Sequence, residues 1–86
     1  MLKPIRKSEF AESKADDQVL LYSAETEAIH CLNPTAYLIW TLCDGEHTIE
    51  DLVANLRASF AIPDGIDLRA DVQRTLDTFV RKGLLQ

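Results

Sequence analysis

Cysteine, glycine and long apolar runs are scarce in this sequence, and each scarcity argues against a class of protein. Among the 86 residues there are 2 cysteines, 3 glycines and 3 prolines. Two cysteines without C-x-x-C spacing are too few for a disulfide-rich scaffold and do not form a zinc motif. We therefore expect two free, buried thiols, at Cys31 and Cys43, and no metal or other cofactor.

Membrane and secretion signals are also missing. No apolar run approaches the roughly 20 residues that a helix needs to span a bilayer. The N-terminus, MLKPIRKSEF, is charged and lacks the apolar segment of a signal peptide. With 47% hydrophobic and 27% charged residues, the composition is typical of a globular protein. We expect one cytoplasmic domain over residues 1–86, with no membrane contact.

Positive charge is scarce in the middle of the chain. The sequence has 9 basic and 14 acidic residues, for a net charge of −5. Residues 15–67 hold one basic residue, Arg57, and ten acidic ones. Because Lys and Arg contacts to phosphates dominate nucleic-acid affinity, this distribution argues against DNA or RNA as a partner. A basic peptide or partner protein fits it better.

Three short segments have the composition of β-strands. Residues 3–12 mix apolar side chains with Pro4 and several charges, which predicts a weak edge strand, and residues 13–17 follow as a polar loop. Residues 19–22 are apolar throughout, which predicts a central strand covered on both faces. Residues 28–32 follow after a short link, so we expect a hairpin and an antiparallel meander.

Three helices with well-marked ends follow the strands. Asn33 is a favoured N-cap before a proline, which predicts a first helix over residues 35–42. Thr48 and Asp67 are N-cap candidates for the second and third helices, and Gly83 ends the third. Strands followed by a block of helices predict the α+β class. We expect a winged-helix-like fold with a three-stranded antiparallel sheet followed by three α-helices.

The third predicted strand is an unprotected edge of the sheet. It contains no lysine, no proline and no formal charge. Such an edge exposes unpaired N–H and C=O groups to any other strand. Either the third helix covers it, or a peptide pairs with it and gains affinity from main-chain hydrogen bonds.

The order and spacing of several short motifs over residues 19–85 add a family resemblance. The motifs are Leu32-Asn33 with Ala36 and Trp40, Cys43-Asp44-Gly45 with Thr48-Ile49, and Asp71-Val72 with Leu76 and Lys82-Gly83-Leu84. Together they resemble the PqqD-like family, the recognition domains of pathways that make ribosomal, post-translationally modified peptides. One departure concerns the hairpin, where many members have glycine and this sequence has Glu27 or its neighbours.

The resemblance implies a function as well as a fold. Such a domain binds the leader of a precursor peptide as a strand added to its third strand, in the groove against its third helix. It then presents the precursor to a modifying enzyme, such as a radical SAM enzyme, a cyclase or a protease. The domain itself is not an enzyme and needs no cofactor.

Transferred to this sequence, the resemblance assigns nine peptide-binding residues. On the third strand they are Ala28, Ile29, His30, Cys31 and Leu32, and on the third helix they are Leu68, Asp71, Val72 and Thr75. Strand alternation separates Ile29 and Cys31 from His30 and Leu32, and the sequence leaves open which pair meets the leader. Leu68 and Val72 fit plain core packing equally well. We expect Asp71 to meet a basic or polar residue of the leader.

Two functions of other classes stay open. Arg69, Arg74 and Arg81 on the third helix would suit a winged-helix regulator that binds nucleic acid. The unprotected edge would also suit a structural module that pairs or swaps strands with a second copy, and we expect a monomer or a weak dimer. A catalytic pair of His30 and Cys31 is geometrically poor, because adjacent strand residues point to opposite faces.

Overall fold

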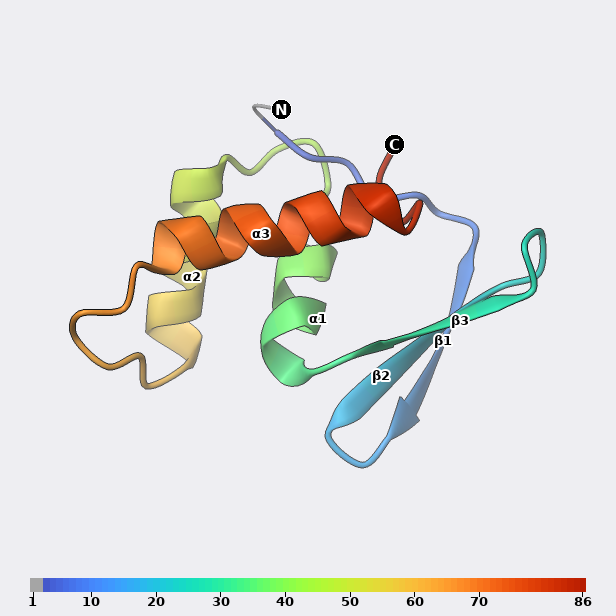
Figure 1. Ribbon diagram of the computed structural model, residues 1–86, viewed down its shortest axis with the longest axis horizontal. Helices are drawn as coiled ribbons and strands as arrows, with labels where there is room; N and C mark the ends of the chain where they lie inside the picture. The colour runs from blue at the N-terminus through green and yellow to red at the C-terminus, as the bar shows by residue number, and fades with distance from the viewer. Residues whose placement is uncertain (1–2) are drawn as a thin grey trace.

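A computed structural model describes residues 3–86 of the chain, with three strands first and three helices after them (Figure 1). The elements are β1 (Phe10–Ala15), β2 (Gln18–Ser23), β3 (Ala28–Leu32), α1 (Pro34–Thr41), α2 (Ile49–Ser59) and α3 (Leu68–Arg81). The strands form an antiparallel sheet in the order β1-β2-β3. The predicted α+β class and the meander with the second strand at its centre are therefore confirmed.

The first strand begins later than the sequence pattern predicted. We expected a strand over residues 3–12 and a loop over residues 13–17, whereas β1 spans Phe10–Ala15. The reason is a tight turn, because only Asp16 and Asp17 join β1 to β2, and Asp16 takes a left-handed φ of 57°. Aspartate tolerates this conformation better than most residues do. The polar residues before the turn can therefore pair as a strand.

The segment before β1 pairs with distant parts of the chain instead of with the sheet. Its main chain forms bridges from Ile5 to Asp44 and from Arg6 to Leu85. We call residues 4–7 the N-terminal segment. This segment connects the turn after α1 to the tail after α3, two regions that local sequence patterns do not link.

Arg6 also holds the end of α1. Its guanidinium group donates to the Thr41 carbonyl at 2.9 Å and lies 5.4 Å from the centroid of the Trp40 ring. A positive charge at a helix C-terminus complements the helix dipole, and the indole face attracts a cation. The residue that the sequence analysis assigned to an edge strand therefore fixes the position of a helix.

The predicted helix ends are confirmed. Asn33 caps α1 and Asp67 caps α3, and each side chain accepts a hydrogen bond from a main-chain N–H. Thr48 and Asp51 form a reciprocal capping box at the start of α2. Gly83, just past α3, takes a left-handed φ of 74°. The helices therefore begin and end where the local chemistry indicated.

The helices and one face of the sheet share a hydrophobic core. On β2, the side chains of Val19 and Leu21 are buried, whereas that of Tyr22, on the opposite face of the same strand, is 42% exposed. The prediction that this strand is covered on both faces is wrong, because core residues contact only one face of it. The α3 residues in the core are Leu68, Val72, Leu76 and Phe79. Val80, on the same helix, is half-exposed.

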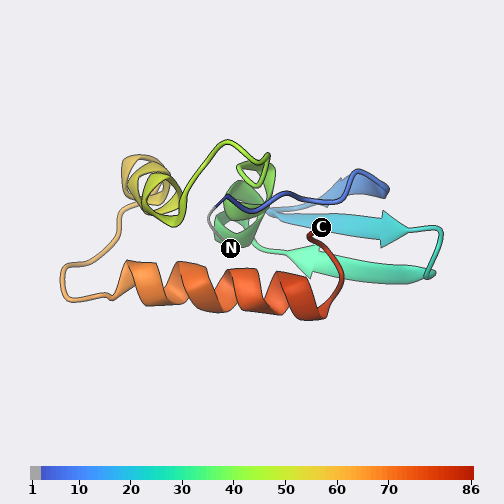
Figure 2. The ribbon, with the colours of Figure 1, turned by 90° about the horizontal axis from the view of Figure 1, so that it is seen from above.

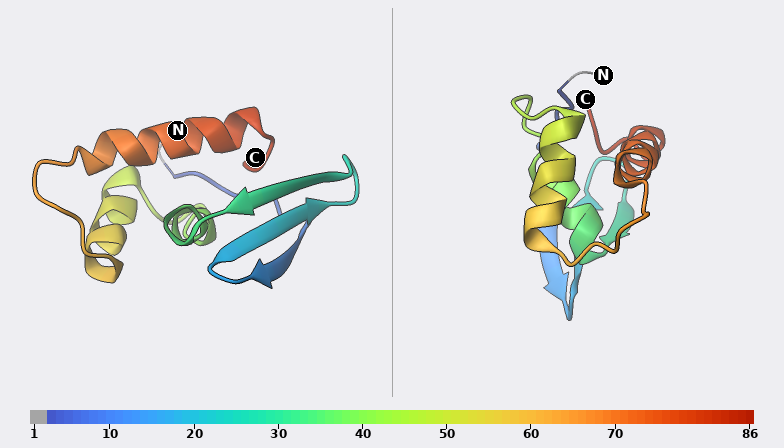
Figure 3. Two further views of the ribbon diagram at one scale, coloured as in Figure 1. Left: turned by 60° about the horizontal axis from the view of Figure 1, so that its bottom comes forward. Right: turned by 90° about the vertical axis from the view of Figure 1, so that its left-hand side faces the viewer.

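The third helix lies along the open side of the sheet. Viewed from above, the elements lie across the molecule in the spatial order β1, β2, β3 and then α3 (Figure 2). Figure 3 (left) shows that α3 does not continue the sheet: its C-terminal end lies near β3, and the rest of the helix extends past the sheet beside α1 and α2. The edge of β3 that points away from β2 is therefore on the same side of the sheet as the C-terminal end of α3.

Two glycines with left-handed backbones allow a matched test of the N-terminal segment. Gly45 has a φ of 81° and Gly65 has a φ of 87°. A Cβ at position 45 would lie 3.0 Å from Ile5 Cγ1, whereas a Cβ at position 65 would meet nothing within 4 Å. We expect Gly65→Ala to cost about 1 kcal/mol from backbone strain and Gly45→Ala to cost about 1–3 kcal/mol more from overpacking. Urea unfolding measures both, and equal losses would show that the N-terminal segment does not press on the turn.

His47 and Asp44 make the stability of the α1–α2 turn depend on pH. Their side chains meet at 2.9 Å, and this hydrogen bond raises the pKa of His47 and lowers the pKa of Asp44. The His47 contribution is present below its ordinary pKa of 6.5 and is lost as pH rises through the raised value. The Asp44 contribution is present above its ordinary pKa of 3.8 and is lost as pH falls through the lowered value.

We therefore expect the free energy of unfolding to fall as pH rises above 6.5, the ordinary His pKa, and to fall less in His47→Gln. Urea unfolding across this range is the measurement, with the His47 ring protons followed by NMR. If the free energy of unfolding depended on pH in the same way in the wild type and in the variant, the contribution assigned to this pair would be contradicted.

Candidate functional site

The strand β3 is an open edge of the sheet. It pairs with β2 on one side. Within residues 3–86, no main-chain hydrogen bond from any element other than β2 reaches Ala28–Leu32. The sequence analysis left open whether the third helix covers this edge, and α3 does not bond to it through the main chain.

The direction of each main-chain group follows from the turn between β1 and β2. Because this turn has two residues, Ala15 and Gln18 form a hydrogen-bonded pair. Hydrogen bonds alternate along antiparallel strands, so the even-numbered residues of β2 bond to β1 and the odd-numbered ones bond to β3. Because odd-numbered residues of β2 are paired with even-numbered residues of β3, the N–H and C=O groups of those β3 residues point to β2. The N–H and C=O groups of Ile29 and Cys31 therefore point to the open edge.

The side chains of β3 divide between two faces as the alternation predicted. Leu32 is buried, and the His30 ring packs edge-on against Phe10 with centroids 6.0 Å apart. Ile29 and Cys31 are exposed on the outer face. The prediction that Cys31 is buried is wrong, because no helix covers this face, whereas Cys43 is buried, and both thiols are free.

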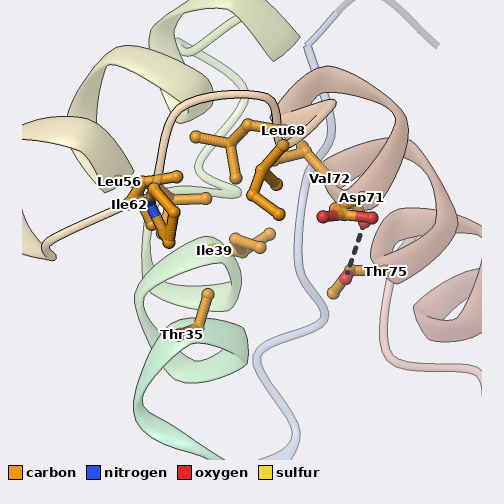
Figure 4. Close-up of a pocket in the computed structure, with 10 residues that line it drawn as sticks. Thr35, Ile39, Leu56, Ile62, Leu68, Asp71, Val72 and Thr75 are labelled. Carbon is orange, nitrogen blue, oxygen red and sulfur yellow. Dashed lines mark hydrogen bonds between the residues drawn. The ribbon is translucent and has the colours of Figure 1, made fainter.

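An apolar pocket opens beside the N-terminal half of α3 (Figure 4). Its volume is about 280 Å³. All four α3 residues predicted for the site contribute to its wall. The lining residues are Thr35, Ile39, Leu56, Ile62, Pro63, Ile66, Leu68, Asp71, Val72 and Thr75.

Two of the predicted wall residues also belong to the core. Leu68 is 5% exposed and Val72 is fully buried. Each side chain has one surface in the core and one along the pocket, so the core reading is confirmed, while contact with a leader peptide stays a prediction. A substitution at either position would disturb both.

The pocket lies on the predicted flank of α3. The opposite flank faces α2, because Arg69 forms an ion pair with Glu50 at 2.9 Å. Asp71 and Thr75 lie on the other side, toward Thr35 in the first turn of α1 (Figure 4). The Thr75 hydroxyl donates to the Asp71 carbonyl at 3.0 Å, which directs its methyl group away from the helix backbone.

Asp71 forms an ion pair within its own helix. We expected this carboxylate to meet a basic or polar leader residue, and in the structure its partner is Arg74. The side chains of Arg74 and Asp71 are 71% and 44% exposed, so water screens the pair. Asp71 therefore contributes a neutral pair to the wall of the pocket, and its contact with a leader stays a prediction.

Sequence reasoning missed the far wall of the pocket. Ile62, Pro63 and Ile66 come from the connection between α2 and α3, which the pattern indicated only as a break. The signal available in the sequence was weak: the loop carries two isoleucines, Ile62 and Ile66, close to a proline. Single apolar residues at a surface are common, so this pattern does not by itself indicate a pocket wall.

The structure separates the two parts of the predicted site. No β3 residue lines the pocket. The strand ends at Leu32, however, and Thr35 of the pocket wall follows three residues later. The pocket therefore lies beyond the C-terminal end of the open edge.

The part of the chain from residue 3 to residue 86 offers no group of three His, Cys, Asp or Glu residues arranged to hold a metal ion. Over the same residues, no helix is long and apolar enough to cross a membrane. The features that distinguish the site are thus an open strand edge and an apolar pocket.

The chain matches the model of a known protein family and resembles solved structures. The family model described as "Coenzyme PQQ synthesis protein D (PqqD)" matches residues 18–85. A search of curated protein sequences gives no match.

Three solved structures share the fold. "TbiB1 in Complex with the TbiA(beta) Leader Peptide" has 21% identity and a TM-score of 0.76, over 95% of this chain and 94% of that chain. "Lasso peptide synthetase B1 complexed with the leader peptide" has 18% identity and a TM-score of 0.78, over 98% of each chain. "Structure of the heterocyclase TruD" has 23% identity and a TM-score of 0.65, over 100% of this chain but 11% of that chain.

The two thiols provide a direct test of the exposure of β3. Cys31 is exposed, whereas burial raises the pKa of Cys43 to about 12, and its thiol donates to the Ile39 carbonyl at 3.1 Å. We expect a maleimide to label the folded protein once, at Cys31, and to reach Cys43 only in denaturant. Mass spectrometry of the digested protein identifies the labelled residue. Labelling of neither thiol, or of both at similar rates, under native conditions would contradict the outer face described here.

Proposed function

The chain belongs to the PqqD family, and on this premise we propose that it is a non-catalytic peptide-binding module. It captures the leader of a precursor peptide as a strand added to β3 and presents that peptide to a modifying enzyme. The observation that carries this proposal is the open main chain of Ile29 and Cys31. An extended peptide would satisfy these groups with its own N–H and C=O groups.

The apolar pocket supplies an anchor for the same peptide. A strand that runs along β3 and continues past Leu32 reaches the wall around Thr35. There it can bury one large aliphatic or aromatic side chain against Leu68 and Val72. Full burial of such a side chain contributes about 1.5–3 kcal/mol. Main-chain pairing would then provide general affinity, and the pocket would select the peptide that carries the right anchor.

The relatives of known structure support a peptide as the partner. Two of them are complexes with leader peptides, and they cover nearly the whole of this chain. In the heterocyclase the same fold makes up 11% of a larger chain. A module that serves an enzyme, either as part of it or as a separate subunit, is consistent with both kinds of relative.

The charges of α3 favour a peptide over nucleic acid. Arg69 pairs with Glu50 and Arg74 pairs with Asp71, so two of the three arginines that would suit DNA are neutralised within the chain. The ten acidic residues of the middle region add a repulsive field toward phosphates. The same field would attract a basic leader.

The position of α3 favours a single strand over a second copy of the sheet. A neighbouring copy that paired through β3 would bring its own β2 into the space along which α3 runs (Figure 2). An isolated peptide strand needs room for one strand only. We therefore place the strand-paired dimer second.

Proline substitutions at the two sheet edges test the proposal. Cys31→Pro removes an N–H from the β3 edge, while Lys14→Pro is the matched control, since alternation directs the Lys14 N–H away from β2 at the other edge. The probe is the tightest peptide selected from a displayed library of random dodecapeptides. We expect Cys31→Pro to weaken its binding about tenfold or more, because a peptide carbonyl loses its donor, and Lys14→Pro to leave it nearly unchanged.

Amide shifts of the wild-type protein locate the peptide. On titration, the largest changes are expected in β3 and along the Asp71–Thr75 flank of α3. Equal effects of the two prolines, or amide shifts concentrated elsewhere, would refute strand addition at this edge.

A further inference from the structure

The outer face of the sheet carries no charged side chain. Two rows of side chains cross all three strands on this face. One row is Ala11, Tyr22 and Ile29, and the other is Ser13, Leu20 and Cys31. Ala15 and Gln18 complete the face. By contrast, Glu12 and Lys14 of β1 alternate to the other face. In a chain with 27% charged residues, a solvent-facing sheet surface without a charge is unusual.

The apolar centre of this face lies at the open edge. Ile29 is 65% exposed, the highest value among the exposed large apolar side chains of residues 3–86. Its direct cross-strand partner is Tyr22, at 42% exposed. Leu20 and Cys31 form the neighbouring pair. Edge strands usually carry a charge at such positions, so the exposed apolar pair at the edge calls for an occupant.

The size of the face argues against a second copy as that occupant. A stable interface uses about 20–30 residues on each side, and this face has eight side chains. It is, however, continuous with the open edge, because Ile29 and Cys31 contribute side chains to the face and main-chain groups to the edge. A strand added to β3 would place every second side chain on this same face, directly beside them.

We infer that the peptide taken up at β3 carries two uncharged side chains, β-branched or aromatic, on its outer face, separated by one residue. Ile29 selects one of them and Cys31 selects the other. The inference rests on the proposed strand addition and adds the chemical class of the peptide. The residue between the two points into the groove, and the pocket beside α3 reads a different part of the peptide. The sequence preference of the module therefore has two components, on opposite sides of the added strand.

A charge placed on the outer face should change this preference in a defined way. The probe is the displayed library of random dodecapeptides, selected on the wild-type protein and on three variants. With the wild type, we expect Val, Ile, Phe, Tyr or Trp to be enriched severalfold at two positions one residue apart. With Ile29→Lys, we expect Asp or Glu to replace the apolar residue at one of them, since opposite charges pair favourably across strands.

The second and third variants make the test independent of any single substitution. Cys31→Lys should move the acidic residue by two positions along the peptide. Ala11→Lys, on the same face but on the far strand, should leave the preference as in the wild type. Both Ile29 and Cys31 are exposed, so neither lysine enters the core, and circular dichroism verifies the fold.

The outcomes separate this inference from the proposed function. If the wild type selects no peptides, the proposed function fails and the inference fails with it. If it selects peptides that shift the amides of β3 but show no apolar preference at two alternate positions, only the inference is overturned. Concentration-dependent dimers in sedimentation that Ile29→Lys abolishes would assign the face to a second copy and would also overturn it.

Discussion

Every main-chain N–H and C=O group in a folded protein needs a hydrogen-bond partner, and on β3 the chain meets this requirement on one side only. The two-residue turn at Asp16 and Asp17 fixes which groups of β2 bond to which neighbour. Through the register, that choice leaves the main chain of Ile29 and Cys31 to water. The open edge proposed to bind the peptide therefore depends on the geometry of a turn at the other side of the sheet.

The width of the space beside this edge depends on the chain termini. The Lys7 N–H donates to the Leu84 carbonyl at 3.0 Å, just past the end of α3, and Arg6 holds the end of α1. Residues 4–7 thus connect α1 and α3 directly, and β1 begins three residues later at Phe10. The C-terminal end of α3 is positioned by these hydrogen bonds, and its N-terminal half by core packing. Both ends of the helix are therefore fixed relative to β3.

Local chemistry could be predicted from the sequence, whereas long-range pairing could not. The three N-caps and the end of α3 were predicted correctly, because a cap depends on a few neighbouring residues. The N-terminal segment was assigned to the sheet because nothing in its sequence indicates bridges to Asp44 and Leu85. Turns without glycine were equally hard to recognise. Glu27 takes a left-handed φ of 56° at the hairpin where many family members have glycine, so this chain accepts some backbone strain there.

The site residues show the same contrast between what local sequence indicates and what tertiary packing decides. The α3 members of the pocket, Leu68, Asp71, Val72 and Thr75, were named before the structure because the family resemblance points to this helix, and helical spacing places them on one side of it. The far wall comes from a connecting loop, whose path depends on tertiary packing. The exposure of Cys31 was missed for a similar reason, because the sequence pattern does not tell how many faces of a three-stranded sheet the helices cover.

An unprotected apolar edge normally invites uncontrolled pairing between chains, and under the proposed function the size of the partner would limit this risk without charged residues on β3. An isolated extended segment needs room for one strand only, whereas a strand that already belongs to another sheet brings its neighbouring strands with it. Discrimination of this kind depends on the shape of the partner, not on its sequence. Under the proposed function, β3 can therefore stay uncharged, so that Ile29 and Cys31 would be available for contacts with the peptide. Selectivity for a leader and resistance to self-association would then have the same structural origin, the room for a single strand at the β3 edge.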